Sequence, residues 1–123
     1  MSGKRILVVD DDPDARFLLR LIFESDGYQV SDAQDGIAAL IRVNQSLPDL
    51  VITDMIMPLM DGGELIERLR SDPRTASLLV MAVSGVPGET KTALQADAVL
   101  DKPFDRSRLL AVVRSLLAPK QLI

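Results

Sequence analysis

The stretch Ile6-Leu7-Val8-Val9-Asp10-Asp11-Asp12 joins an unbroken apolar run to three consecutive carboxylates. The run is too short for a helix, and apolar runs of this length are typical of strands buried on both faces of a parallel sheet. Pro13 follows and suits the first turn of a helix, while Asp12 suits the N-cap. The stretch therefore predicts a buried strand that ends in acidic residues and leads directly into a helix.

The same alternation of strand and helix continues along the chain. Apolar segments of strand length are expected at Lys4–Val9, Tyr28–Ser31, Asp49–Thr53, Leu78–Val83 and Ala98–Leu100. Apolar residues at helical spacing lie between most of these segments and after the last one. Strands that alternate with helices favour an α/β fold, in which helices cover both faces of a parallel sheet.

The spacing of residues also predicts the first two helices and the apolar face of the first. In the first helix the apolar residues are Ala15, Leu18, Leu19 and Ile22. Ile37, Leu40, Ile41 and Asn44 have the spacing of a second helix. Asp35 and Asp61 are expected in turns or in the first turn of a helix, outside any metal site.

Composition limits the possible functions. The chain has 123 residues, which suits one domain over residues 1–123, and only 3% of them are aromatic, so the core must be aliphatic. The net charge of −4 and the lack of a basic block do not favour contact with nucleic acid. No apolar run approaches the roughly 20 residues of a membrane helix, and no signal peptide is apparent, so a cytoplasmic protein is expected.

Two residue types are absent, which removes whole classes of chemistry. The chain has no cysteine, so a disulfide framework, a thiolate nucleophile and the usual structural zinc site are excluded. It has no histidine, so a histidine general base is excluded as well. The remaining reactive groups are carboxylates, hydroxyls and lysine, together with any metal ion that they bind.

Five polar residues follow or end predicted strands: Asp10, Asp11, Asp54, Ser84 and Lys102. Right-handed crossovers place the carboxyl ends of parallel strands at one edge of the sheet. Ligands of such folds bind outside those ends, where the strand order reverses. We therefore expect the five side chains to meet in one crevice.

The expected crevice suits a divalent cation and a phosphoryl group. Neighbouring carboxylates repel one another unless a cation joins them, and all-oxygen ligation favours Mg²⁺ or Mn²⁺. Asp54 can then act as a carboxylate nucleophile toward phosphorus. Ser84 can donate a hydrogen bond to one phosphoryl oxygen, and Lys102 can neutralise another.

These residues resemble the response regulator receiver domain of two-component signalling. The resemblance covers essentially the whole chain, through the opening stretch, Asp54-Met55-Ile56-Met57-Pro58-Leu59-Met60-Asp61-Gly62 and Asp101-Lys102-Pro103-Phe104. It implies a flavodoxin-like doubly wound sheet of five parallel strands in the order 2-1-3-4-5. It also implies phosphoryl transfer from a sensor histidine kinase or a histidine phosphotransfer protein, with possible homodimer formation on phosphorylation.

The resemblance assigns roles to the same residues. Asp54 matches the phosphoacceptor, Asp11 a direct metal ligand, and Asp10 a ligand that acts chiefly through water. Ile56 matches the residue that offers its backbone carbonyl to the metal. Ser84 and Lys102 match the hydroxyl and the lysine of the family, and the Lys102–Pro103 peptide bond is expected to be cis.

The chain departs from the family pattern in two places. Val99 occupies the position where the family usually has an aromatic residue or histidine that acts as a switch. The segment between Ser84 and Lys102 is about four residues shorter than usual, close to one helical turn. We therefore expect a shortened or irregular fourth helix and an output that differs from the usual one.

Two alternative functions are possible. The first is a Mg²⁺-dependent phosphohydrolase with an aspartyl nucleophile, since Asp10-Asp11-Asp12 contains the Asp-x-Asp of such enzymes. Such enzymes have a hydroxyl residue two positions after the second aspartate, where this chain has Asp14. The chain is also too small to hold the cap domain of such an enzyme. The second is a constitutive interaction domain without chemistry, which the complete acidic site opposes. The sequence therefore favours a signalling domain over an enzyme.

Overall fold

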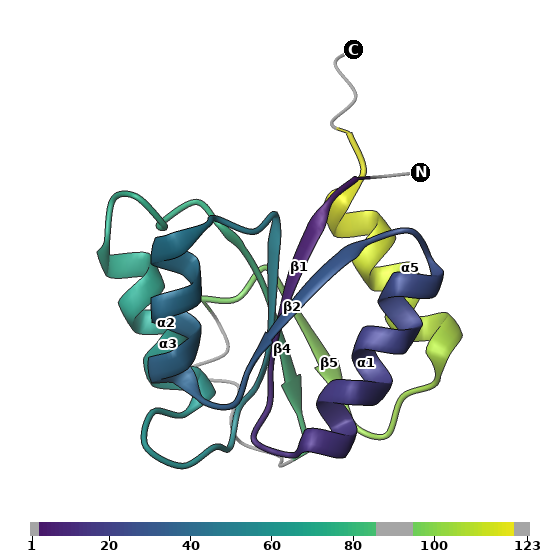
Figure 1. Cartoon of the computed structure of the whole chain (residues 1–123), viewed down its shortest axis with the longest axis horizontal. Coiled ribbons are helices and arrows are strands. Elements are labelled where there is room, and N and C mark those ends of the chain that lie inside the picture. Colours follow the sequence, from purple (N-terminus) through teal and green to yellow (C-terminus); the bar gives the residue numbers. More distant parts are fainter. Residues whose placement is uncertain (1–2, 86–94, 120–123) are drawn as a thin grey trace.

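Five parallel strands form one sheet, in the order β2-β1-β3-β4-β5 (Figure 1). The computed structural model describes residues 3–85 and 95–119. The strands are β1 Arg5–Val9, β2 Gln29–Ala33, β3 Leu50–Asp54, β4 Leu79–Ser84 and β5 Ala98–Asp101. In the register of the sheet, Ile6 of β1 pairs with Val30 of β2 and with Leu50 of β3. The predicted α/β class and strand order are confirmed.

Helices cover both faces of the sheet, as Figure 1 shows. On one face lie α1 Pro13–Ser25 and α5 Arg106–Leu117, and on the other lie α2 Gly36–Gln45 and α3 Gly62–Ser71. Successive strand residues alternate between the two faces, so Ile6 and Val8 enter the core under α1 and α5. Leu7 and Val9 enter the core under α2 and α3. The first strand is therefore buried on both faces, as its unbroken apolar run predicts.

An aspartate caps the N-terminus of every helix in the described ranges. Each cap accepts a hydrogen bond of 2.8–3.0 Å from a backbone N–H in the first turn. The capping residues are Asp12, Asp35, Asp61 and Asp105. A cap of this kind is worth about 1 kcal/mol relative to alanine. The predicted cap at Asp12 is confirmed, and Asp35 and Asp61 serve as caps at the expected turns.

The predicted core face of α1 is partly wrong. Leu18 is 58% exposed, and the fully buried residue of this helix is Phe23. Leu19 and Ile22 pack against the core as predicted. The spacing pattern could not exclude Leu18, because an apolar side chain at the edge of the stripe fits the same period whether or not another element covers it.

The predicted second helix is confirmed as α2, but both of its isoleucines lie at the surface. Ile37 is 46% exposed and Ile41 is 55% exposed, whereas Ala39 and Val43 are buried. Gly36 packs against the side chain of Met60, and a Cβ atom there would lie 2.6 Å from the Met60 Cγ. Leu40 packs against the core as well, so the helix turns Ala39, Leu40 and Val43 inward and leaves the two isoleucines outside.

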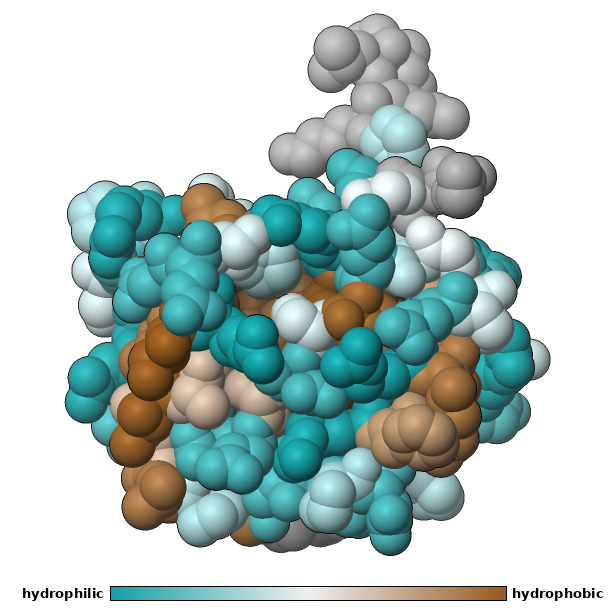
Figure 2. Space-filling model, in the orientation of Figure 1, coloured by the Kyte–Doolittle hydropathy of each residue, from teal (hydrophilic) through white to brown (hydrophobic). Residues whose placement is uncertain are grey.

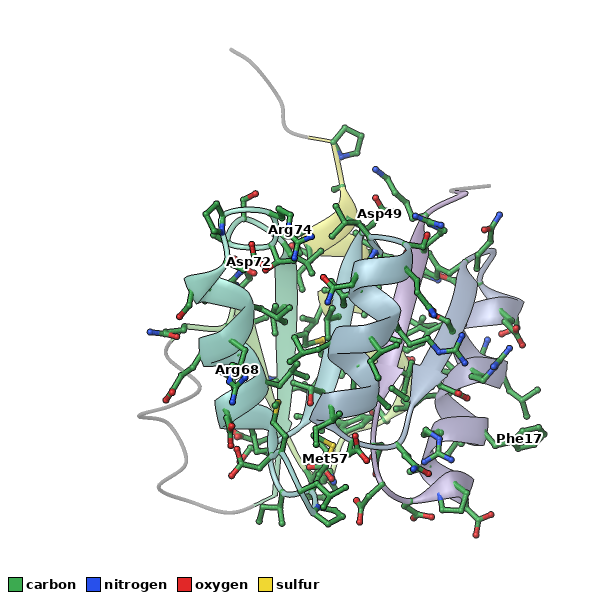
Figure 3. All side chains as sticks on the ribbon, turned by 60° about the vertical axis from the view of Figure 1, so that its left-hand side comes forward. Phe17, Asp49, Met57, Arg68, Asp72 and Arg74 are labelled. Carbon is green, nitrogen blue, oxygen red and sulfur yellow. The ribbon has the colours of Figure 1, made fainter. Side chains whose placement is uncertain are left out.

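Exposed hydrophobic side chains gather in two patches, one over α1 and one over α2 (Figure 2). The α1 patch consists of Phe17, Leu18 and Leu21, which are 49–64% exposed. Phe17 points away from the body of the protein (Figure 3).

Within residues 3–85 and 95–119, none of the helices has the length and hydrophobicity needed to cross a membrane. The predicted short fourth helix lies outside the described residues, and Val99 of β5 is 41% exposed.

Candidate functional site

Three carboxylates lie together at the carboxyl edge of the sheet. Asp10 follows β1, Asp11 comes next, and Asp54 is the last residue of the neighbouring strand β3. One carboxylate oxygen from each residue lies within 4.8 Å of the others. The cluster exists because β1 and β3 are adjacent and parallel, so residues 44 positions apart end at the same edge. The sequence analysis predicted this convergence.

Asp10 is the most buried member of the cluster, with 7% of its surface exposed. One of its carboxylate oxygens accepts the N–H of Asp12 at 2.9 Å. Burial raises the pKa of Asp10, and repulsion from Asp54 and Asp11 raises it further. The Asp12 N–H and the Lys102 ammonium oppose this rise in pKa. A positive charge among the three carboxylates would therefore relieve an unfavourable interaction.

The Asp54 carboxylate is oriented by the backbone N–H of the next residue and lies beside a lysine. Its Oδ1 accepts the N–H of Met55 at 2.8 Å, and its Oδ2 lies 3.5 Å from the Nζ of Lys102. The Asp54 side chain is 15% exposed and that of Lys102 is 43% exposed. The carboxylate can thus be reached from solvent, and the ammonium of Lys102 lies beside it. These are the requirements of a nucleophile that receives a phosphoryl group.

Ser84 and Lys102 come to the site from β4 and from the end of β5. Ser84 is the last residue of β4 and is buried, and its carbonyl accepts the N–H of Lys102 at 2.8 Å. The Lys102–Pro103 peptide bond is cis, as the resemblance implied. Ile56, the expected carbonyl donor, lies two residues beyond Asp54, with its side chain 59% exposed. The predicted residues thus share one edge of the sheet.

The chemistry of the acidic cluster suits Mg²⁺ or Mn²⁺. The donor set is made of carboxylate oxygens, which hard cations prefer, and cysteine and histidine are absent from the chain. Mg²⁺ commonly uses one or two direct carboxylates and completes its octahedron with water and phosphate oxygens. Asp10, Asp11 and Asp54 supply enough carboxylates for that arrangement.

Two contributors to the site were missed from the sequence. Arg16 of α1 donates a hydrogen bond of 2.7 Å to the Asp10 carbonyl, which ties the first helix to the acidic loop. Gly62 packs its backbone against the Asp54–Met55 peptide group. The turn expected at Asp61 gives no sign of this contact, because the contact joins two elements that are separate in the sequence.

A cavity of about 440 Å³ lies beside the carboxylates, between α1, the sheet and the start of α5. Its walls are mainly apolar, and Asp10, Asp54 and Lys102 also line it. The lining side chains are mostly aliphatic, with Phe104 as the aromatic one. The scarcity of aromatic residues noted in the sequence is consistent with this incompletely filled space.

Comparisons with known proteins agree on one family. The family model of the response regulator receiver domain matches residues 6–114. The DNA-binding dual master transcriptional regulator RpaA of Synechocystis is 40% identical over 118 residues, which cover 92% of this chain and 48% of the relative. The chain thus spans about half the length of this curated relative.

Solved structures show the same fold over nearly the whole chain. The signal receiver domain of a signal transduction histidine kinase from Syntrophus aciditrophicus superposes with a TM-score of 0.88 and 29% identity, covering 98% of this chain and 97% of the other. The response regulator TrrA of Thermotoga maritima, in complex with Mg²⁺ and BeF, gives a TM-score of 0.85 and 30% identity, covering 92% and 98%.

Proposed function

We propose that this chain, which belongs to the response regulator receiver domain family, accepts a phosphoryl group on Asp54 in a Mg²⁺-dependent reaction. Phosphoacceptor signalling in two-component systems is the function of this family and of this chain. The proposal treats residues 1–123 as one receiver domain. The observation that carries it is the meeting of three carboxylates with Lys102 at one edge of the sheet.

In the proposed reaction, a carboxylate oxygen of Asp54 attacks phosphorus as the bond from phosphorus to the donor nitrogen breaks. The donor histidine keeps the electron pair of that bond and takes up a proton. Lys102, 3.5 Å from Asp54 Oδ2, neutralises the charge on one phosphoryl oxygen. We assign the hydrogen bond to another phosphoryl oxygen to the hydroxyl of Ser84, the last residue of β4. Transfer of this kind depends mainly on positioning and on charge neutralisation.

Receiver domains bind Mg²⁺ at such acidic clusters, and we assign the ion here to Asp10, Asp11, Asp54 and the carbonyl of Ile56. When bound, the ion neutralises the carboxylates and orients the phosphoryl oxygens. The closeness of the three carboxylates supports the assignment, because one oxygen from each lies within 4.8 Å of the others and like charges at this separation repel. The similar TrrA structure, a complex with Mg²⁺ and BeF, supports it as well.

The proposed donor is a sensor histidine kinase or a histidine phosphotransfer protein in the cytoplasm. Its docking surface includes the α1 patch, because Leu18 lines the same cavity as Asp54. Replacing Phe17 with serine should slow transfer from a phosphorylated histidine phosphotransfer protein and leave labelling by acetyl phosphate unchanged. Slower labelling by both donors would instead indicate damage to the site.

Three finer features belong to the same proposal. The domain promotes its own phosphorylation and dephosphorylation through Asp54, Ser84 and Lys102, without acting as an enzyme on other substrates. Phosphorylation favours a homodimer. Where a relative such as RpaA binds DNA, we assign that contact to the half of the relative that this chain does not match.

The test is intact-mass analysis after incubation with Mg²⁺ and acetyl phosphate. We expect one added phosphoryl group, lost in Asp54→Asn and without Mg²⁺, and retained in Asp14→Asn. Asp14 is a suitable control because it is an exposed carboxylate in the first turn of α1, at the same edge of the protein. Labelling of Asp10 in place of Asp54 would favour the phosphohydrolase alternative and contradict the proposal.

A further inference from the structure

A glycine packs its backbone directly onto the peptide group that follows the proposed phosphoacceptor. Gly62 is the first residue of α3, and its N–H donates to the Met55 carbonyl at 3.1 Å. A Cβ atom at position 62 would lie 2.2 Å from the Asp54 carbonyl oxygen and 2.8 Å from the Met55 Cα. Both are backbone atoms, so neither can turn aside as a flexible side chain can. Helix α3 can begin here only if residue 62 has no side chain.

The same peptide group is also held from its other sides. The Thr53 hydroxyl donates to the Asp54 carbonyl at 2.8 Å. The Met55 N–H donates to the Val83 carbonyl of the neighbouring strand at 3.3 Å. Thr53 is fully buried, so water does not compete for its hydroxyl. The position of the Asp54–Met55 peptide is therefore set by β3, by β4 and by the start of α3 together.

This peptide group sets the orientation of the carboxylate, because the Met55 N–H also donates to Asp54 Oδ1 at 2.8 Å. The other oxygen, Oδ2, then faces Lys102 at 3.5 Å. If the peptide rotated or shifted, both oxygens would move relative to the acidic cluster and the lysine. A misplacement of about 1 Å can cost on the order of 100-fold in rate when positioning supplies most of the catalysis.

We propose that Gly62 is a positioning residue for phosphoryl transfer. By lacking a side chain, it lets α3 press on the Asp54–Met55 peptide and so fixes the direction of the Asp54 carboxylate. Gly62 contacts neither the phosphoryl group nor the metal and acts only through this peptide. The inference rests on the proposed role of Asp54 as the phosphoacceptor.

Gly36 differs from Gly62 in an instructive way. A Cβ atom at position 36 would also be too close to a neighbour, but that neighbour is the side chain of Met60, which can move. A Cβ atom at Gly85, close to the site, would lie 3.4 Å from the Lys102 Cδ, which is an ordinary contact. Of these three glycines, Gly62 is the one whose close approach is to the backbone of the phosphoacceptor.

The test compares Gly62→Ala with Leu69→Ala. Leu69 lies two turns further along α3 and is 1% exposed, so its truncation weakens the same helix far from Asp54. Labelling by acetyl phosphate is followed at saturating Mg²⁺, at a temperature where unfolding curves show both variants folded. We expect the maximal rate to fall on the order of tenfold or more in Gly62→Ala and to stay at the wild-type value in Leu69→Ala.

A second readout needs no metal and no phosphodonor. The NMR resonance of the Met55 amide reports the position of the peptide group directly. We expect it to shift in metal-free Gly62→Ala and to remain unchanged in Leu69→Ala and in Gly85→Ala. A glycine required only for the stability of α3 would not produce this pattern.

A wild-type labelling rate in Gly62→Ala, or equal slowing in both α3 variants, would overturn the inference. If Gly62→Ala does not fold, Thr53→Val loosens the same peptide with a side chain of similar shape. That variant should slow labelling about threefold or more and shift the Met55 amide, and no change in either would also overturn the inference. A wild-type protein that is not labelled on Asp54 would overturn the proposed function itself.

Discussion

At the scale of single residues, the ionised carboxylate of Asp10 is destabilised by burial and by repulsion from Asp54 and Asp11, and a metal ion can relieve this. Its pKa is raised above the ordinary value of an aspartate, chiefly by burial and then by the neighbouring carboxylates. Folding therefore favours the protonated form. The stability that this provides is fully present below the pKa of the unfolded chain and is lost as the pH rises through the folded-state pKa.

Replacing Asp10 with asparagine should therefore stabilise the metal-free protein at neutral pH. The amide is permanently neutral and can still accept the N–H of Asp12 through its oxygen. We expect a melting temperature a few degrees higher than that of the wild type at neutral pH, with the difference vanishing under acidic conditions. Thermal unfolding in a chelator across this pH range checks the sign. A difference that does not depend on pH would contradict the explanation.

Leu59 adopts a backbone conformation that favours glycine. Its φ is 69°, and the Met60 N–H donates to the Pro58 carbonyl at 2.8 Å, so Leu59 is the centre of a γ-turn. The side chain is 80% exposed and gains little from packing. Leu59→Gly should therefore stabilise the protein by about 0.5–1 kcal/mol, the left-handed penalty less the entropy cost of glycine.

Urea unfolding of Leu59→Gly measures this gain. Leu59→Val is the matched comparison, because a β-branched residue is less tolerant of a positive φ than leucine. We expect the valine variant to be less stable than the wild type by about 1 kcal/mol. The reverse order of the two variants would show that the turn is not strained.

At the scale of elements, Arg70 joins α3 to β4 and to the segment before β5. Its guanidinium donates to the carbonyls of Gln95, Ala76 and Leu78 and pairs with Asp97 at 2.9 Å. The same Asp97 oxygen accepts the Val80 N–H of β4 at 2.8 Å. Only 19% of the Arg70 side chain is exposed. One side chain therefore fixes the relative positions of three parts of the fold.

Truncating Arg70 to alanine should destabilise the protein by about 1–2 kcal/mol, because it removes hydrogen bonds to three carbonyls and to Asp97 and leaves the part-buried Leu78 carbonyl without this donor. Arg68 is the control. It projects from the outer face of the same helix (Figure 3), is 58% exposed, and pairs with Glu64 one turn away. Arg68→Ala should cost less than about 0.5 kcal/mol. Equal losses in urea unfolding would contradict the assigned role of Arg70.

At the scale of the whole molecule, metal binding and folding are linked. An ion that binds only the folded protein stabilises it by about 2.7 kcal/mol at 100 times its dissociation constant. We expect added Mg²⁺ to raise the melting temperature of the wild type and to have much less effect on Asp11→Asn, which lacks one carboxylate of the cluster. Sodium chloride at matched ionic strength is the control for screening of the net charge of −4.

Asp14→Asn is the matched variant for this measurement, since Asp14 is acidic and nearby but outside the cluster. It should respond to Mg²⁺ as the wild type does. An equal response of Asp11→Asn would show that the ion binds elsewhere or acts only by screening.

The sequence by itself determined the order of the elements and the composition of the site. Runs of adjacent apolar residues, the N-cap at Asp12 and the polar residues that end each strand are local signals, which a chain carries whatever its tertiary structure. Parallel pairing follows from the strand–helix alternation, and it places Asp10, Asp54 and Lys102 at one edge. The site could therefore be predicted from residues far apart in the sequence.

Only the tertiary structure decided how those elements pack. It turned α2 so that Ala39 faces inward and Ile37 outward. It brought Gly62 onto the Asp54 peptide and Arg70 onto three carbonyls of other segments. Such contacts depend on distances between elements that no local pattern encodes, since many side chains satisfy the same periodicity and only packing selects among them.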